Sequence, residues 1–143
     1  MSANLGVAVG PVHELGVAVG PVHERVERQR ELARQGERLA AEYLERRGCT
    51  LLARNWRCRE GELDIVGYDG TSVIVCEVKT RSGLRCGAPA ESVTSSKIAR
   101  IRRAASKWLS TFGVPPVPVR FDVVSVILAP GQRPRIRHIP GAF

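Results

Sequence analysis

The stretch that decides the fold runs from residue 61 to residue 81 and reads GELDIVGYDGTSVIVCEVKTR. Its two parts, residues 62–68 and 72–80, are rich in Val and Ile, which predicts two β-strands. Asp69-Gly70 between them is typical of a tight turn. The stretch therefore predicts an antiparallel hairpin of two partly buried strands.

Charged side chains interrupt this otherwise apolar hairpin. Because strand side chains alternate, Glu77 and Lys79 project from one face of the later strand and Cys76 from the other. Glu62 and Asp64 share one face of the earlier strand. The alternation therefore gathers acids and one of the chain's three lysines on the hairpin.

Turn length decides which of these acids meet. A two-residue turn places Glu62 opposite Glu77, and a four-residue loop places Asp64 there instead. A three-residue loop would turn the two acidic faces away from each other. Either even register thus brings carboxylates of both strands onto one face.

Converging carboxylates repel one another unless a cation neutralises them, and their hard oxygens suit Mg²⁺ or Mn²⁺. Such an ion polarises a phosphate and activates water, while Lys79 could orient the nucleophile or offset charge. These parts fit phosphodiester hydrolysis. The alternative is a set of structural salt bridges, such as Glu77 with Lys79 or Arg81, and spacing alone favours neither explanation.

The rest of the chain supplies elements around the hairpin. Residues 25–47 predict a helix ended by Gly48, with Glu37 at the edge of its apolar arc. Residues 50–56 predict a strand, residues 95–110 a second helix capped by Thr94 or Ser95, and residues 119–128 a buried strand parallel to its neighbour. The tail after residue 128 is basic and without predicted structure. This order predicts an α/β domain with a mixed sheet flanked by helices.

The second predicted helix is strongly basic, with no acidic residue between positions 93 and 111. The whole chain carries 22 Lys and Arg against 14 Asp and Glu, a net charge of +8, which favours a polyanionic partner. Aromatic residues make up only 5% of the chain, too few for a single-strand stacking platform. A duplex or branched DNA, bound through its phosphates, fits better than a solvated helix face.

Several classes of protein are excluded by composition. The 43% hydrophobic and 25% charged residues are typical of one globular domain and not of a disordered chain. The four cysteines form no Cys-x-x-Cys pair of the kind that binds zinc. The sequence shows neither a secretory signal nor a membrane-spanning segment, so we expect a cytoplasmic protein without a membrane partner.

The N-terminus contains an exact repeat, since residues 5–14 and 15–24 both read LGVAVGPVHE. Two copies of ten residues are too few for a solenoid. A metal-binding or docking tail built on His13 and His23 is one interpretation. We favour a flexible extension over residues 1–24, followed by the folded domain over residues 25–143.

Asp64 followed by Glu77-Val78-Lys79, with an acid on an earlier helix, resembles the PD-(D/E)XK motif of restriction-endonuclease-like nucleases. A closer similarity is to the YraN family, small bacterial proteins related to archaeal Holliday junction resolvases. The segments that carry it are residues 36–44 (GERLAAEYL), 54–57 (RNWR), 61–66 (GELDIV), 77–81 (EVKTR), 97–100 (KIAR) and 120–124 (RFDVV).

The resemblance implies a restriction-endonuclease-like fold and assigns roles to individual residues. Glu37 becomes the helix acid, Asp64 and Glu77 metal-binding carboxylates together with Glu37, Lys79 the catalytic lysine and Glu62 a supporting acid. Leu63 stands where the motif's Pro would be. The predicted DNA-binding residues are Arg81, Lys97, Arg100, Arg103 and Lys107.

The function implied is a Mg²⁺- or Mn²⁺-dependent endonuclease acting on duplex, branched or damaged DNA. Cutting both strands of a symmetric junction would favour a homodimer with two-fold symmetry. The first alternative is a non-catalytic DNA-binding module that keeps the nuclease fold. The second is a structural or interaction protein whose acids only form salt bridges.

Overall fold

The computed structural model describes residues 20–83 and 93–143. The chain divides into two compact units, residues 1–31 and 32–143. Helix α3 (Gly20–Arg46) begins five residues before its predicted start and includes the end of the second decapeptide copy. Pro21 is tolerated in the first helical turn because the amide there needs no intrahelical partner. The remainder of the repeat and residues 84–92, between the hairpin and the second predicted helix, lie outside the described residues.

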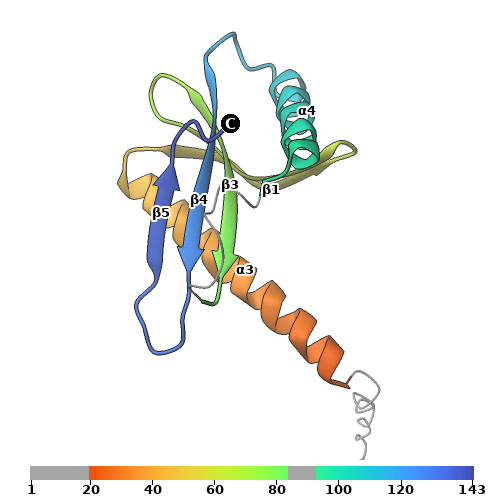
Figure 1. Cartoon of the computed structure of the whole chain (residues 1–143). Helices are drawn as coiled ribbons and strands as arrows, with labels where there is room; N and C mark the ends of the chain where they lie inside the picture. The colour runs from red at the N-terminus through yellow and green to blue at the C-terminus, as the bar shows by residue number, and fades with distance from the viewer. Residues whose placement is uncertain (1–19, 84–92) are drawn as a thin grey trace, which may run out of the picture. The chain divides into compact units, whose positions relative to one another are not determined.

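The described strands form one mixed five-stranded sheet in the order β1-β2-β3-β4-β5 (Figure 1). Their bounds are Thr50–Cys58, Gly61–Tyr68, Val73–Arg81, Val119–Ile127 and Arg135–Ile139. Strands β3 and β4 are parallel, as predicted, and the other neighbouring pairs are antiparallel. Helix α4 (Ser95–Thr111) connects β3 to β4, and its predicted cap Thr94 accepts a hydrogen bond from the Lys97 amide at 3.3 Å. The predicted restriction-endonuclease-like architecture, a mixed sheet flanked by helices, is confirmed.

Strand β5 is an element that the sequence interpretation missed. The basic tail pairs antiparallel with β4, from Val123 opposite Ile139 to Ile127 opposite Arg135. Its alternation is short, with Arg135 and Arg137 exposed and Ile136 packed against the core. Pairing with β4 outweighs the low strand propensity of so basic a segment, because propensity is weak next to tertiary pairing.

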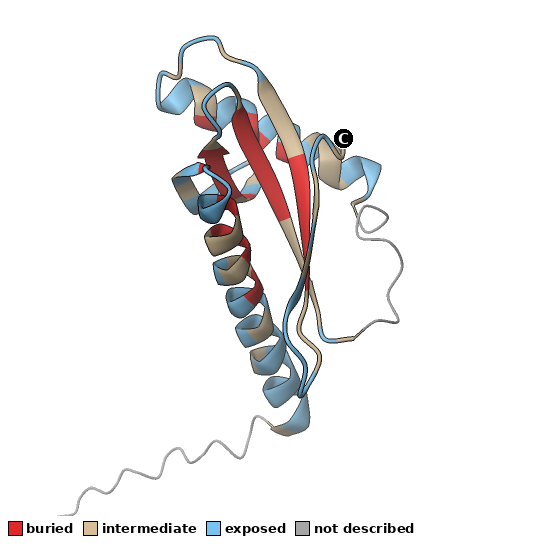
Figure 2. Ribbon diagram, turned by 90° about the vertical axis from the view of Figure 1, so that its left-hand side faces the viewer, coloured by how far each residue is buried: buried red, intermediate tan, exposed pale blue. Residues whose placement is uncertain are grey.

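The two faces of the sheet carry separate apolar layers. On the α3 side, the buried residues include Ala40, Leu44, Ile65, Ile74, Cys76, Val124 and Val126. On the α4 side they include Leu63, Val66, Val73, Val75, Ile101, Ala105 and Trp108. Figure 2 shows the buried residues in the sheet and along the sheet-facing side of the helices. The predicted alternation along β3 is confirmed, since residues 73 and 75 face one layer and residues 74 and 76 the other.

Helix α3 approaches β3 unusually closely at Gly36. A Cβ atom at this position would lie 1.9 Å from Oγ1 and 2.6 Å from Cγ2 of Thr80. Only glycine therefore allows the helix to lie at this distance from the strand. The contact holds the neighbouring Glu37 next to the sheet.

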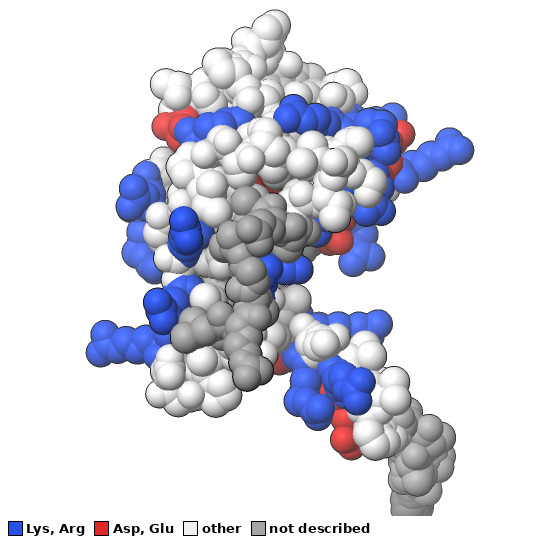
Figure 3. Space-filling model, viewed as in Figure 1, with Lys and Arg blue, Asp and Glu red and all other residues white. Residues whose placement is uncertain are grey.

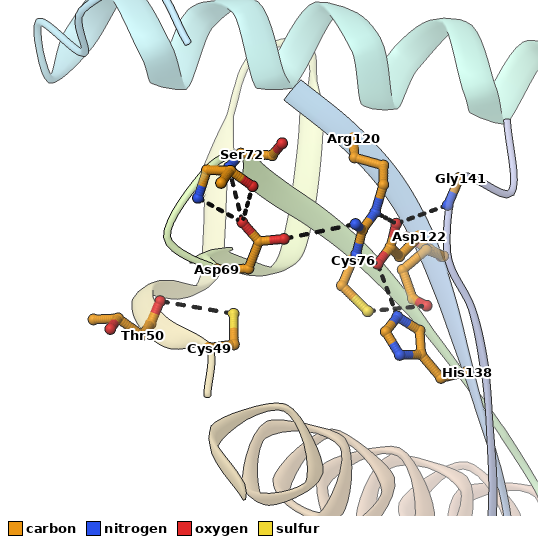
Figure 4. A network of polar contacts seen from close by, with 11 residues as sticks. Cys49, Thr50, Asp69, Ser72, Cys76, Arg120, Asp122, His138 and Gly141 are labelled. Atoms are coloured by element: carbon orange, nitrogen blue, oxygen red, sulfur yellow. Dashed lines mark hydrogen bonds and ion pairs between the residues drawn. The ribbon is translucent and has the colours of Figure 1, made fainter. Parts of the chain in front are cut away.

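A buried polar network joins β4 to β5 on the α3 side (Figure 4). Asp122, fully buried, accepts hydrogen bonds from Nε and Nη2 of Arg120 at 2.8 Å and from the Gly141 amide at 2.9 Å. Nε2 of His138 lies 2.8 Å from the same carboxylate, and the His138 ring packs edge-on against Tyr43. His138 is therefore mostly buried, with its side chain 12% exposed, because β5 turns it inward.

In the part of the chain that the structure describes, no helix is both long and apolar enough to cross a membrane.

Candidate functional site

The hairpin between β2 and β3 closes with a four-residue loop, not with the tightest turn. Tyr68 pairs with Val73, and Oδ1 of Asp69 accepts hydrogen bonds from the amides of Thr71 and Ser72 at 2.9 and 2.8 Å. This Asp-centred turn replaces the two-residue turn predicted from Asp69-Gly70. Of the two even registers, the structure therefore has the one in which Asp64 lies nearest to Glu77.

Strand β2 leaves β3 at Asp64. The paired residues of the two strands run from Tyr68 only as far as Ile65, whereas β2 stays paired with β1 to its first residue. The Val78 amide, just beyond the last pair, donates its hydrogen bond to Oδ2 of Asp64 at 2.9 Å. The Asp64 side chain thus takes over from a strand carbonyl where the sheet opens.

A cavity of about 320 Å³ lies at this opening. Helices α3 and α4 and both hairpin strands contribute to its lining, which consists of Glu37, Gly61, Glu62, Asp64, Glu77, Val78, Lys97, Arg100 and Ile101. Four of these nine residues are acidic and two are basic. The departure of β2 from β3 explains how Glu37 on the α3 side and Lys97 on the α4 side reach the same space.

Glu37 is held at the cavity by an interaction that the sequence did not indicate. Its carboxylate accepts a hydrogen bond from Asn55 of β1, whose φ of 51° is in the left-handed region that Asn tolerates better than most residues. Burial raises the pKa of Glu37, and the negative charge of Glu62 adds to this against the effect of Asn55. Asn55 lies in the motif segment over residues 54–57, but its residue type alone did not indicate that it would hold Glu37.

The strongest electrostatic strain in the cavity is on Asp64. Burial, followed by repulsion from Glu77, raises the pKa of the Asp64 carboxyl to about 8. The Val78 hydrogen bond opposes this rise but does not cancel it. A cation between the two carboxylates would remove the repulsion, so the charge distribution suits a positive ligand.

Glu77 already has one cationic partner. Nζ of Lys97 lies 2.6 Å from its Oε2, and the Glu77 side chain is only 10% exposed. Lys97 was predicted to bind DNA and Lys79 to act in the site, yet Lys97 lines the cavity and Lys79 does not. The sequence indicated the contact between Lys97 and Glu77 only through the position of Lys97, in the first turn of the helix that follows the hairpin.

The predicted site residues thus separate into two groups. The structure brings together Glu37, Glu62, Asp64, Glu77, Lys97 and Arg100 around the cavity. Four predicted residues do not line it, namely Lys79, Arg81, Arg103 and Lys107. Glu62 pairs with Arg57 at 3.4 Å, and both side chains are well exposed, which places this acid at the rim.

The donor set limits what kind of metal site this could be. Among residues 20–83 and 93–143, no three His, Cys, Asp or Glu side chains are grouped closely enough to hold an ion by themselves. Asp64 and Glu77 nevertheless offer oxygens to one cavity, and Mg²⁺ is commonly held by one or two carboxylates, water and substrate phosphate. The residues therefore fit a two-carboxylate site completed by substrate, and not an all-protein cage.

The comparison with known proteins identifies the family. Residues 36–126 match the family described as "Uncharacterised protein family UPF0102". The chain belongs to UPF0102, the YraN family. Every residue that lines the cavity lies inside the matched segment, whereas β5 and His138 lie beyond it.

Individual relatives support the same assignment over most of their length. The chain is 52% identical over 112 residues to a UPF0102 protein of Frankia alni, covering 78% of this chain and 93% of the relative. It is 49% identical over 119 residues to a UPF0102 protein of Nocardia farcinica, covering 83% and 94%. A UPF0102 protein of Acidothermus cellulolyticus is 48% identical over 122 residues, covering 78% and 92%.

Proposed function

We propose that this UPF0102 protein is a cytoplasmic, Mg²⁺- or Mn²⁺-dependent endonuclease that hydrolyses phosphodiester bonds of duplex, branched or damaged DNA. The observation that carries the proposal is the convergence of Asp64 and Glu77 in one cavity next to the basic helix α4. Burial and then the neighbouring carboxylates raise the pKa of Asp64, and charged groups in such a place are costly to keep in a fold unless they bind a cation.

The roles of the side chains follow from their positions. Asp64 and Glu77 would hold the divalent ion, which when bound supplies charge stabilisation of the phosphate and a more acidic water. Glu37, whose pKa is raised, is suited to accept a proton from the attacking water at its carboxylate oxygen or to complete the metal site. Arg100, at the cavity wall, would bind a non-bridging phosphate oxygen.

Helix α4 would guide the DNA backbone to this cavity. Lys97 and Arg100 line the cavity itself, and Arg103 and Lys107 continue along the helix as exposed side chains. Basic side chains are widespread on the face of the molecule seen in Figure 3, whereas acidic ones are few. Phosphate contacts of this kind provide affinity without sequence specificity. Cleavage of both strands of a symmetric junction would use two copies of the chain related by a two-fold axis.

The decisive experiment incubates purified protein with labelled linear, flapped and four-way DNA in Mg²⁺, Mn²⁺ or EDTA. Cleavage should require the metal and fall by at least roughly a hundredfold in Asp64→Asn and Glu77→Ala, which remove the proposed metal ligands. Lys79→Ala tests whether Lys79, to which the motif assigns a catalytic role, is needed for cleavage. The matched control is Glu42→Ala, since this acid pairs with Arg38 on the outer side of α3 at 3.2 Å.

A non-catalytic DNA-binding module is the second candidate, and one contact favours it. Lys97 already neutralises Glu77, so this carboxylate has a partner without any metal. This function would be supported if the wild-type protein bound the DNA substrates but cut none of them in either metal. If Lys97→Glu/Arg100→Glu kept both DNA binding and DNA cleavage, a nucleic-acid function on this surface would be contradicted altogether.

A further inference from the structure

Lys97 and Glu77 form the closest ion pair in the cavity. The 2.6 Å contact joins the N-terminal turn of α4 to the middle of β3, and the Lys97 side chain is 36% exposed while that of Glu77 is 10% exposed. Lys97 therefore lies between solvent and a carboxylate proposed to bind metal. A divalent ion that binds Glu77 must compete with this ammonium group.

The position of Lys97 on its helix makes the pair easier to separate. Lys97 lies three residues after the cap Thr94, in a first turn without acidic residues. The amide groups of a helix N-terminus carry partial positive charge, so a lysine there is disfavoured and an anion is favoured. A DNA phosphate at this helix end would interact with both the positive end of the helix dipole and Lys97.

We infer that Lys97 is a built-in counter-ion that occupies Glu77 in the free protein and moves to a DNA phosphate when substrate binds. The inference rests on the metal site of the proposed function and adds a form of regulation to it. Metal binding would be weak without DNA, because the ammonium group competes for Glu77. DNA would strengthen metal binding by drawing Lys97 away, and by thermodynamic linkage the metal would strengthen DNA binding equally.

Binding of Mn²⁺, measured by calorimetry without any cleavage readout, tests this inference. The variants are Lys97→Gln, which removes the competing charge, and Lys97→Arg, which retains it. The matched control is Arg135→Gln, the same charge loss at an exposed position of β5 that does not line the cavity. Each protein is titrated alone and with a saturating phosphorothioate duplex, chosen because it resists hydrolysis, after subtraction of Mn²⁺ bound by the duplex alone.

Without DNA, Lys97→Gln should bind Mn²⁺ roughly tenfold more tightly than the wild type, equivalent to about 1.4 kcal/mol. Lys97→Arg should stay within about twofold of the wild type because it keeps the charge, and Arg135→Gln because an exposed charge has a small effect. The duplex should tighten Mn²⁺ binding roughly tenfold for the wild type and Arg135→Gln but less than twofold for Lys97→Gln. Thermal melting of each variant verifies that it is folded.

Equal or weaker Mn²⁺ binding by folded Lys97→Gln would overturn the inference, as would an undiminished effect of the duplex on that variant. Failure of the proposed function has a different signature. If Lys97→Gln gains Mn²⁺ affinity but the wild type cuts no DNA, the counter-ion role of Lys97 is supported and the proposed nuclease activity is contradicted. If the wild type cuts DNA in Mg²⁺ but Lys97→Gln gains no affinity, only the counter-ion is refuted.

Discussion

At the scale of single residues, the acids of this protein behave in opposite ways according to their partners. Asp64 lies among other carboxylates, and burial and repulsion raise its pKa to about 8. Burial would also raise the pKa of Asp122, but hydrogen bonds from Arg120, Gly141 and His138 outweigh it and lower that pKa. The partly buried Asp64 thus costs stability when charged, whereas the fully buried Asp122 is stabilised in its charged form.

The raised pKa of Asp64 predicts that metal-free protein loses stability as the pH rises. The unfolded chain releases this proton near pH 4 and the folded protein only near pH 8, so the folded state binds more protons between these values and the free energy of unfolding falls across that window. Asp64→Asn is neutral throughout and keeps an oxygen for the Val78 amide. In EDTA, its melting temperature relative to the wild type should rise by a few degrees from pH 4.5 to pH 8.

Adding Mn²⁺ at pH 8 should stabilise the wild type but not Asp64→Asn. Glu42→Gln changes a partly exposed acid outside the cavity; it is the control and should show no such pH dependence relative to the wild type. A difference between Asp64→Asn and wild type that stays constant with pH would show that Asp64 is not electrostatically strained.

Asp122 gives the converse prediction. Asp122→Asn removes the charge that Arg120 and His138 surround, and should lower the free energy of unfolding at pH 7 by about 2 to 4 kcal/mol. Urea denaturation would measure this loss. Because the folded-state pKa of Asp122 is lowered, its contribution is present at neutral pH and disappears as the pH falls through that pKa. A loss below about 0.5 kcal/mol, the size expected for an exposed pair, would contradict the role of the network.

At the scale of elements, the site depends on how closely α3 approaches β3 and on where β2 leaves β3. The first depends on Gly36 against Thr80, and the second on Asp64 as acceptor for the Val78 amide. Together they bring Glu37 to an opening between two strands. The first feature joins elements that are distant in sequence, whereas the second arises within the hairpin, between residues 14 positions apart.

Gly36→Ala should separate helix from strand. Alanine favours a helix over glycine by about 1 kcal/mol, but its Cβ would lie 1.9 Å from Oγ1 of Thr80, and such overpacking costs about 1 to 3 kcal/mol. We expect a net loss of roughly 1 kcal/mol in urea denaturation and a larger relative loss of DNA cleavage, since Glu37 moves with the helix. Thr80→Ala removes two of the three close atoms and should restore part of the stability in the double variant. Additive effects of the two substitutions would argue against this contact.

At the scale of the whole molecule, the basic side chains behind the net charge of +8 are not expected to contribute equally to DNA binding. The basic side chains of α4 extend from the cavity, whereas Arg135 and Arg137 project from β5, at the end of the strand order. A localised interface and a diffuse positive field make different predictions for DNA binding.

Arg103→Gln/Lys107→Gln should weaken duplex binding and reduce the slope of log affinity against log salt by roughly 2, if each side chain contacts one phosphate. Arg135→Gln/Arg137→Gln removes the same charge from β5 and should change the slope by less than half as much. Fluorescence anisotropy between 50 and 200 mM salt measures both. Equal slopes for the two double variants would mean that net charge, and not α4, attracts the DNA.

The sequence by itself determined the elements and the candidate acids. Val- and Ile-rich alternation identified the hairpin, helical periodicity identified both helices, and the motif segments identified the family and selected Glu37, Asp64 and Glu77. These features are local, so neighbouring residues are enough to specify them. The predicted roles of these acids as catalytic and metal-binding residues remain predictions.

Only the tertiary structure decided which side chains share the cavity. The four-residue loop set the register, the departure of β2 opened the sheet, and Lys97 approached Glu77 while Lys79 stayed outside the lining. Strand β5 and the burial of His138 likewise depend on pairing with β4. Such contacts join residues far apart in the chain, and their geometry follows from how the layers pack, which no local pattern encodes.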